Sequence, residues 1–283
     1  MNTEKACAKI NLTLDVLGKR EDGYHELAMV METVDLADIL RFSHSGQGIQ
    51  VKTNLSFLPS GPTNLAAKAA MCFAQATGLT VEPLTIEIEK HIPVCAGTAG
   101  GSSDAAAVLR YLNRALNAGL SDEALQKIGE AVGSDVPYCV TGGTALAQGR
   151  GEVLTPLPSL PRCALVLCKP AFSISTPALF AEIDRHKLRR RPDSAGVQKA
   201  LEAGDLAGVA RRLYNVFEDV LPPRQAKAVA EIKNHLITCG ALGANLSGTG
   251  PTVFGIFDDE HLAQEAYEVL RETYPDTFLC RNV

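Results

Sequence analysis

The sequence predicts an α+β fold, and three observations support this. Several segments alternate apolar and polar residues with a period of two, which is typical of strands with one buried and one solvated face. Other segments repeat apolar residues at helical spacing. The two kinds of segment do not follow one another in the regular strand–helix–strand order of a parallel α/β sheet. The chain has 283 residues, of which 46% are hydrophobic and 21% charged, so it can bury a sizeable core and is long enough for two domains.

The first half of the chain begins with alternating segments, of which ACAKINLTLDVL at 6–17 is the first. Asn64 is suitably placed to cap a helix, and Gly78 to end it. LTIEIEKHI at 84–92 has one apolar and one acidic face. We expect strands at 6–17, 29–42, 84–92 and 142–154, and helices at 64–77, 103–116 and 121–132.

In the second half, the proline-rich stretch TPLPSLP at 155–161 predicts a domain junction, so we expect domains at 1–155 and 156–283. The charge run DRHKLRRRPD at 184–193 is typical of a solvated loop. GALGANLSGTGPTVFGIF at 240–257 predicts a second glycine-rich loop that leads into a strand. We further expect a strand at 163–170 and helices near 196–213, 223–239 and 259–273.

Composition and charge argue against several classes of function. A net charge of -5 does not suit a nucleic-acid binder, which needs a basic surface. The eight cysteines form no Cys-x-x-Cys pair, which argues against a zinc or redox motif, and we assign no residue as a metal ligand. Charged residues interrupt the amino-terminal segment where a signal peptide would be apolar, and no apolar run approaches the ~18 residues of a membrane span. We therefore expect a cytoplasmic protein that binds neither nucleic acid nor membrane.

The segment EKHIPVCAGTAGGSSDAAAVLRYLN at 89–113 has glycines directly before a predicted helix. The first N–H groups of a helix have no partners within it and attract anions, and glycines let the backbone approach a phosphate closely. Ser102 and Ser103 can cap the helix, and we expect Asp104 to complement the helix dipole in the first turn in preference to binding a metal. The loop predicts a phosphate site, with a tight turn that binds no ligand as the alternative.

Neither common nucleotide-binding motif accounts for this loop. Ser102 follows Gly101 where the Walker motif has lysine, and Ala99 interrupts the dinucleotide-binding glycine pattern. A site for phosphoryl transfer would therefore take its positive charge from elsewhere in the chain or from Mg²⁺. Lys9 in AKINL is the candidate, because it lies in an otherwise apolar strand. The alternative is a lysine at a strand edge whose ammonium group reaches water.

Three segments taken together resemble the GHMP kinase superfamily of small-molecule kinases. They are AKINLTLDVLGKREDGYHEL (8–27), IPVCAGTAGGSSDAA (92–106) and LSGTGPTVFGIF (246–257). AKINL followed by DGYHE, together with GSDVPYCVTGGTALAQGRGE at 133–152, is similar to the members that act on a CDP-linked methylerythritol.

The resemblance implies a two-domain GHMP kinase fold. Its amino-terminal, ATP-binding domain would resemble domain 2 of ribosomal protein S5, and its carboxy-terminal domain would be ferredoxin-like. It also implies phosphorylation of the 2-hydroxyl of the CDP-linked methylerythritol with ATP and Mg²⁺, a step of non-mevalonate isoprenoid synthesis. The protein would act as a monomer or a homodimer.

The site residues follow from matching the family pattern. The lysine of AKINL and the aspartate of GSDVP are catalytic in that pattern, and here they are Lys9 and Asp135. The ATP-binding segment would comprise Pro93, Val94, Cys95, Ala96, Gly97, Thr98, Ala99, Gly100, Gly101, Ser102 and Ser103. The substrate-binding residues would be Asn11, Tyr24, His25, Thr176, Phe180 and Gly248, with Tyr24 and His25 on the cytosine and Phe180 on the other face of that base.

The residue types suit these roles. Asp135 lies in the turn GSDVP, where a carboxylate can accept the proton of the hydroxyl; the alternative is a solvated turn residue. Lys9 would hold that carboxylate ionised and stabilise the transferring phosphoryl group. Tyr24 and His25 offer a stacking surface and a hydrogen-bonding ring to a pyrimidine. Gly248 fits a rigid turn that closes on the nucleotide or substrate, with tight packing as the alternative.

The sequence departs from the family pattern at Cys95, Thr98 and Ala99, where small, leucine and glycine residues are usual. These departures bear on the strength of ATP binding and motivate one alternative, a nucleotide-binding regulator descended from a kinase. The retained lysine–aspartate pair argues against it, because a binding module needs neither. The other alternative is a sister kinase that acts on mevalonate, homoserine or a sugar. The Tyr-His pair argues against that, because those acceptors have no base to stack.

Overall fold

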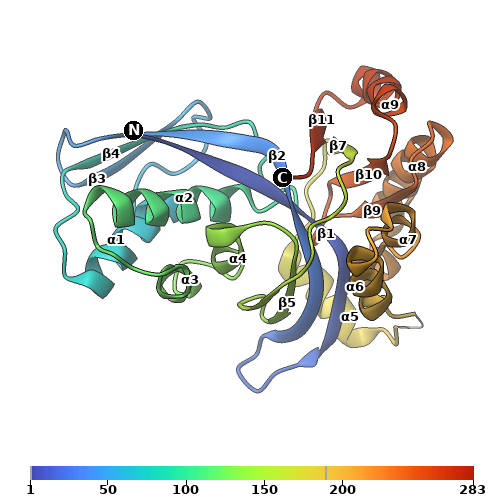
Figure 1. Cartoon of the computed structure of the whole chain (residues 1–283), viewed down its shortest axis with the longest axis horizontal. Helices are drawn as coiled ribbons and strands as arrows, with labels where there is room; N and C mark the ends of the chain where they lie inside the picture. Colours follow the sequence, from blue (N-terminus) through green and yellow to red (C-terminus); the bar gives the residue numbers. More distant parts are fainter. Residues whose placement is uncertain (1, 189) are drawn as a thin grey trace. The chain divides into compact units, whose positions relative to one another are not determined.

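The computed structural model describes residues 2–188 and 190–283, which form two compact units that alternate along the chain (Figure 1). Unit 1 comprises the residues up to Ala8, Leu36–Val94 and Ala99–Gly142, and unit 2 comprises Lys9–Asp35, Cys95–Thr98 and Gly143–Val283. The strands β1 (Thr3–Lys19) and β2 (His25–Ser43) contribute to both. The domain boundary predicted at residue 155 stays a prediction.

Unit 1 is a sheet covered on one face by helices (Figure 1). Its strands follow the order β3-β4-β2-β1, with β4 antiparallel to β2 and parallel to β3. The additional elements are β3 (Ile49–Thr53), β4 (Leu84–Glu89), α1 (Leu65–Thr77), α2 (Gly100–Ala115), α3 (Asp122–Glu130) and α4 (Val136–Thr141).

The caps predicted for α1 are confirmed. The Asn64 side chain accepts a hydrogen bond from the Ala66 N–H at 2.9 Å, which satisfies one of the free donors of the first turn. Gly78 adopts a left-handed conformation (φ 70°) and donates to the Ala74 carbonyl, which ends the helix. The helix buries one side, on which Phe73 is fully buried.

Unit 2 contains a sheet with the strand order β11-β7-β10-β9, in which neighbouring strands are antiparallel. The helices α8 and α9 pack on it. In chain order these elements read β-α-β-β-α-β, which is the ferredoxin-like arrangement expected for the carboxy-terminal domain. They are β7 (Ala164–Cys168), α8 (Pro223–Thr238), β9 (Gly243–Leu246), β10 (Val253–Phe257), α9 (Glu260–Thr273) and β11 (Thr277–Arg281).

The rest of unit 2 adds short elements to β1 and β2. Strand β5 pairs with β2 and with β6, and β8 pairs in parallel with β1. These elements are β5 (Ala145–Gly149), β6 (Val153–Pro156), α5 (Thr176–Arg185), α6 (Ser194–Glu202), α7 (Leu206–Ala210), β8 (Tyr214–Asn215) and the 3₁₀ helix η1 (Val216–Val220).

The prediction of one continuous helix near 196–213 is wrong. The segment forms α6 and α7, because Gly204 takes a left-handed conformation (φ 65°) and the Asp205 side chain caps the next helix through the Gly208 N–H at 2.8 Å. The predicted loop at 184–193 begins after α5 ends at Arg185, and its residue 189 lies outside the described residues.

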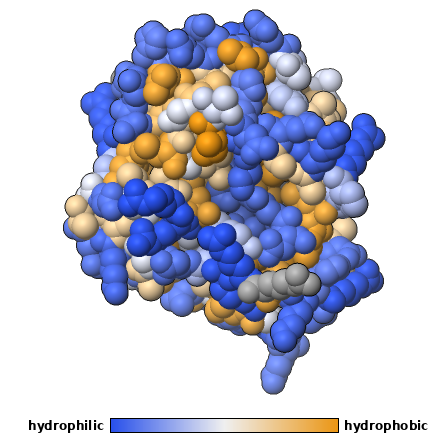
Figure 2. Space-filling model, turned by 90° about the vertical axis from the view of Figure 1, so that its right-hand side faces the viewer, coloured by the Kyte–Doolittle hydropathy of each residue, from blue (hydrophilic) through white to orange (hydrophobic). Residues whose placement is uncertain are grey.

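The face of unit 2 that carries α6 to α9 is largely hydrophilic, with separate apolar patches (Figure 2). Exposed apolar side chains on α8, α9 and β11 include Ile237, Val269 and Leu279. Within the described ranges, no helix combines the length and the apolar character that a membrane span requires.

The interior of unit 2 holds the carboxyl group of Glu32, on β2, with 0% of the residue exposed. Its Oε2 accepts a hydrogen bond from the Thr144 hydroxyl at 2.5 Å, and Thr144 accepts one from the Leu160 N–H at 3.0 Å. Oε1 has no hydrogen-bond partner among the described residues. Burial raises the pKa of Glu32 to about 7, although the bond from Thr144 opposes the shift.

We expect the wild-type protein to lose stability relative to Glu32→Gln as the pH rises from 4.5, the ordinary pKa of glutamate, to about 7. In this window the folded state keeps a proton that the unfolded chain has released, so the free energy of unfolding falls with pH. The full difference corresponds to roughly 3 kcal/mol. Denaturant unfolding at pH 5 and at pH 7.5 measures it, with Glu87→Gln, at an exposed position of β4, as the control. A wild-type-to-variant difference that is the same at both pH values would contradict the prediction.

Candidate active site

The glycine-rich loop before α2 is held in an unusual backbone conformation. Cys95, Gly97 and Ala99 all have positive φ (54°, 76° and 59°), a region that L-residues other than glycine rarely adopt. Ala99 is the residue that directly precedes α2, so the α2 N–H groups begin at Gly100. These groups have no partners within the helix and form a site that suits an anion.

The predicted roles of the polar residues that follow are corrected here. Ser102 and Ser103 do not cap α2, because the helix already begins at Gly100, and the structure gives its first turn no side-chain cap within the described residues. The Ser103 hydroxyl instead donates to the Cys7 carbonyl at 2.6 Å. Asp104 lies beyond the first turn and is buried, so it does not complement the helix dipole as predicted.

Residues 95–98 of the loop are bound by the second glycine-rich loop, which also belongs to unit 2. The Ser247 hydroxyl donates to the Gly97 carbonyl at 3.0 Å, and the Thr252 N–H donates to the Ala96 carbonyl at 3.2 Å. A Cβ atom on Gly97 would lie 2.1 Å from the Ser247 carbonyl oxygen. Glycine is therefore required here by the close approach of the two backbones as well as by the positive φ.

Lys9 is buried in β1, with 4% of the residue exposed. Its ammonium group donates to Asn11 Oδ1 at 2.7 Å, and the same oxygen accepts the Gly248 N–H at 2.9 Å. The Lys9 N–H donates to the Thr98 carbonyl at 3.1 Å. The structure thus brings together, within unit 2, predicted site residues from β1, from the first glycine loop and from the second.

Two further predicted residues of unit 2 form an aromatic stack. The rings of His25 and Phe180 lie 4.5 Å apart at 23°, and His25 Nε2 is 2.8 Å from Asp184 Oδ1. The bond to His25 lowers the pKa of Asp184. Tyr24 is 54% exposed, with the Arg150 guanidinium 4.9 Å from its ring centre. His25 and Phe180 thus contact each other directly, whereas the resemblance places Phe180 on the opposite face of the cytosine from His25.

Asp184 was not predicted, because it lies in the charge run that the sequence analysis interprets as a loop. Thr176, at the start of α5, has its hydroxyl 2.8 Å from that of Thr249 in the second glycine loop. This contact connects the helix that carries Phe180 to the turn that carries Gly248.

In unit 1, Asp135 directly precedes α4 and is half-buried. Its carbonyl accepts the Cys139 N–H at 3.1 Å, and the Val136 N–H binds the Gly133 carbonyl at 3.1 Å, so the turn is tightly bonded. Helix α4 packs against α2, whose amino terminus ends the first glycine loop. Unit 1 therefore combines a helix start whose N–H groups suit an anion with a carboxylate that directly precedes a neighbouring helix.

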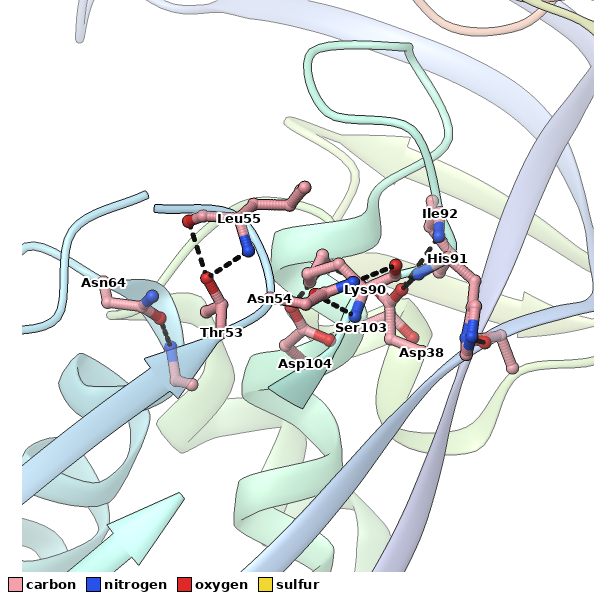
Figure 3. Close-up of polar contacts among 12 residues, drawn as sticks. Asp38, Thr53, Asn54, Leu55, Asn64, Lys90, His91, Ile92, Ser103 and Asp104 are labelled. Atoms are coloured by element: carbon pink, nitrogen blue, oxygen red, sulfur yellow. Dashed lines mark hydrogen bonds and ion pairs between the residues drawn. The ribbon is translucent and has the colours of Figure 1, made fainter. Parts of the chain in front are cut away.

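A buried ionic cluster that the sequence analysis missed lies beside the start of α2 (Figure 3). The Lys90 ammonium group donates to Asp38 and, at 2.6 Å, to Asp104 Oδ2. Asp38 Oδ1 also accepts the N–H groups of His91 and Ile92, at 2.6 and 2.8 Å. The cluster fixes the segment that leads into Pro93 and the first glycine-rich loop.

The charges of this cluster are unequal, with one lysine and two carboxyl groups. Burial lowers the pKa of Lys90, but the carboxylates of Asp104 and Asp38 outweigh it and raise the pKa overall. Burial raises the pKa of Asp104 well above its usual range, despite the opposing charge of Lys90.

Profiles of known families match both halves of the chain. A profile described as GHMP kinases N terminal domain matches residues 64–143, and one described as GHMP kinases C terminal matches residues 197–276. The chain is 44% identical over 279 residues to a protein of Clostridium kluyveri named 4-diphosphocytidyl-2-C-methyl-D-erythritol kinase, with 99% of each chain covered. A protein of the same name from Clostridium perfringens is 43% identical over 282 residues, which cover 99% of this chain and 97% of that one.

Solved structures give the same result for the fold. A 4-(cytidine 5'-diphospho)-2C-methyl-D-erythritol kinase superposes with a TM-score of 0.83 and 31% identity, covering 99% of this chain and 98% of that one. The L. major mevalonate kinase, solved in complex with R-mevalonate, has a TM-score of 0.75 at 19% identity over 99% of this chain and 95% of that one. The second likeness supports the fold alone.

Proposed function

This chain belongs to the GHMP kinase family, and we propose that it transfers the γ-phosphoryl group of ATP to the 2-hydroxyl of 4-diphosphocytidyl-2-C-methyl-D-erythritol. The predicted family and the two-domain GHMP kinase fold are confirmed by the matches in sequence and structure. The chain is accordingly an ATP-dependent small-molecule kinase. A cytoplasmic location and a monomeric or homodimeric state stay predictions.

The observation that carries the proposed acceptor is the aromatic surface of unit 2. The stacked rings of His25 and Phe180, with exposed Tyr24 next along the chain, suit the flat face of a pyrimidine. The hydrogen-bonding edge of His25 suits its polar atoms. Asn11, Thr176 and Gly248 would hold the rest of the acceptor, because they carry polar groups in the same unit.

We assign the phosphoryl-transfer chemistry to the predicted site residues. The N–H groups at the start of α2 and the preceding loop, from Pro93 to Ser103, would bind the ATP phosphates. Asp135 would accept the proton of the 2-hydroxyl as it attacks the γ-phosphorus, and Lys9 would stabilise the negative charge that develops on the transferring group. The buried position of Lys9 supports this role, because charge interactions are stronger away from water.

Mg²⁺ would be held mainly by ATP itself. Over residues 2–188 and 190–283, no group of three His, Cys, Asp or Glu side chains could hold a metal ion. Mg²⁺ in nucleotide sites is commonly bound by phosphate oxygens, water and one or two protein oxygens, so this donor set is compatible with it. The half-buried Ser102 hydroxyl in the first turn of α2 is a suitable protein ligand. The ion, when bound, neutralises phosphate charge.

A panel of alcohol acceptors with Mg-ATP tests the proposed function. We expect phosphorylation of the cytidine compound and little turnover of mevalonate, homoserine or sugars, because those alcohols have no base for the aromatic surface. ADP release coupled to detection of the phosphorylated product gives the rates. Turnover of homoserine in place of the cytidine compound would support a sister kinase, and ATP binding without transfer to any acceptor would support a regulatory protein.

Substitution of the proposed catalytic residues tests their roles. Asp135→Asn should lower kcat by roughly 10²-fold or more while ATP affinity is largely kept, because only proton transfer is lost. Lys9→Ala should remove activity likewise. Asp122→Asn and Lys5→Ala, at exposed positions, are the controls. Near-normal turnover by Asp135→Asn would refute its role as the base, and near-normal turnover by Lys9→Ala would reassign the stabilising charge.

The requirement for Mg²⁺ is tested by metal removal. Activity should disappear in excess chelator and return with added Mg²⁺, because the phosphate charges are then no longer neutralised. Steady-state rates at matched ionic strength measure this. An undiminished rate in chelator would exclude the ion from the reaction.

A further inference from the structure

The turn Leu246–Gly248, at the end of β9, is held by the adjacent segment Asn215–Glu218 of unit 2. We infer that Asn215 and Glu218 are positioning residues for phosphoryl transfer, because they fix the turn that orients Asn11 and, through it, Lys9. This inference rests on the proposed function for its consequence in catalysis. Its structural part rests on hydrogen bonds within unit 2.

The buried side-chain amide of Asn215 forms hydrogen bonds through both its nitrogen and its oxygen. Nδ2 donates to the Leu246 carbonyl at 2.8 Å and to the Gly248 carbonyl at 2.7 Å, while Oδ1 accepts the Phe217 N–H at 3.0 Å. The residue is 0% exposed, so water cannot replace these bonds if they are lost. One side chain thus sets the distance between two carbonyls on either side of Ser247.

Glu218 binds the same turn through a backbone N–H group of the turn. Oε1 accepts the Leu246 N–H at 3.0 Å, and Oε2 accepts a hydrogen bond from the Lys233 ammonium group at 2.6 Å. A bond from a backbone N–H to a carboxylate is stronger than one between neutral groups. Lys233 lies on α8, beside a cavity of about 250 Å³. Lys233 is linked to the turn through its ion pair with Glu218.

The turn Leu246–Gly248 orients the predicted site residues Asn11 and Lys9. Gly248 has a left-handed φ of 56°, and its N–H donates to Asn11 Oδ1 at 2.9 Å, the oxygen that also accepts the Lys9 ammonium group at 2.7 Å. A Cβ on Gly248 would lie 3.4 Å from Lys9 Nζ, so the turn also forms part of the wall around this group. If Gly248 moves, Asn11 loses one of the bonds that fix its amide, and Lys9 loses a fixed acceptor.

The inference predicts a loss of kcat without a matching change in substrate binding. Asn215→Ala and Glu218→Ala should each lower kcat by roughly tenfold or more, with KM for ATP and for the cytidine acceptor changed less than threefold, because small displacements of a catalytic group are costly. Glu218→Gln should recover most of kcat, since its amide oxygen can still accept the Leu246 N–H. Lys233→Met, the matched control, removes the ion pair and leaves that acceptor in place.

Amide hydrogen exchange of residues 245–252, in the full-length protein without substrates, tests the turn independently of activity. Exchange should be faster than in the wild type for Asn215→Ala and Glu218→Ala, and unchanged for Lys233→Met. All rates are taken well below each variant's unfolding temperature, so that a purely structural loss does not lower kcat. If Asn215→Ala does not fold, the three variants at Glu218 and Lys233 decide alone.

A kcat within twofold of the wild type for both alanine variants would overturn the inference. A loss in Glu218→Gln as large as in Glu218→Ala would also overturn it, since the carboxylate charge and not the bond to Leu246 would then matter. Wild-type protein that does not phosphorylate the cytidine compound would contradict the proposed function instead. In that case the exchange measurement still decides, and unchanged exchange in both alanine variants would overturn the inference.

Discussion

A buried ammonium group needs oxygen acceptors that stay in place, and Lys9 imposes this requirement on the core of unit 2. Asn11 meets part of it with an oxygen that is shared with the amide of Gly248. Because Lys9 and Gly248 share this oxygen, the position of the turn after β9 and the position of the Lys9 ammonium group depend on each other. Ser247 precedes Gly248 in that turn, and its hydroxyl binds the Gly97 carbonyl in the other glycine-rich loop. The arrangement of residues around Lys9 is thus one connected hydrogen-bonded structure.

Local sequence patterns were sufficient where the physical cause is local. Asn64 and Gly78 bound α1 as predicted, since a cap depends on atoms a few residues away. The family and the fold are predicted from the resemblance of three ordered segments, and the matches in sequence and structure confirm both. The break at Gly204 was missed, although the left-handed preference of glycine was a usable signal.

Long-range pairing explains most of what the sequence could not predict. Lys90 meets Asp38 across 52 positions of the chain, and His25 meets Asp184 across 159, so no spacing rule relates the partners. The same holds for Asp104, which lies beyond the first turn of α2 and binds Lys90. The catalytic and binding roles of the predicted site residues stay predictions, supported by the contacts that unit 2 makes around Lys9 and by the helix start in unit 1. Ala99 adopts a positive φ of 59° directly before α2, a conformation that costs an L-residue roughly 1–2 kcal/mol.

The alternation of the two units along the chain has a consequence for synthesis on the ribosome. Every residue of unit 1 has been translated once Gly142 is added, whereas unit 2 starts at Lys9 and is complete only at Val283. Domains generally fold as units during synthesis, so unit 1 can fold before unit 2, to which Lys9 belongs. Asn11 is translated directly after Lys9, but the turn Leu246–Gly248 that fixes the Asn11 amide lies within residues 246–283, translated long after it. A chain released before that turn is made lacks the bond from Gly248 that fixes Asn11, so the hydrogen bonds around Lys9 are completed late in translation.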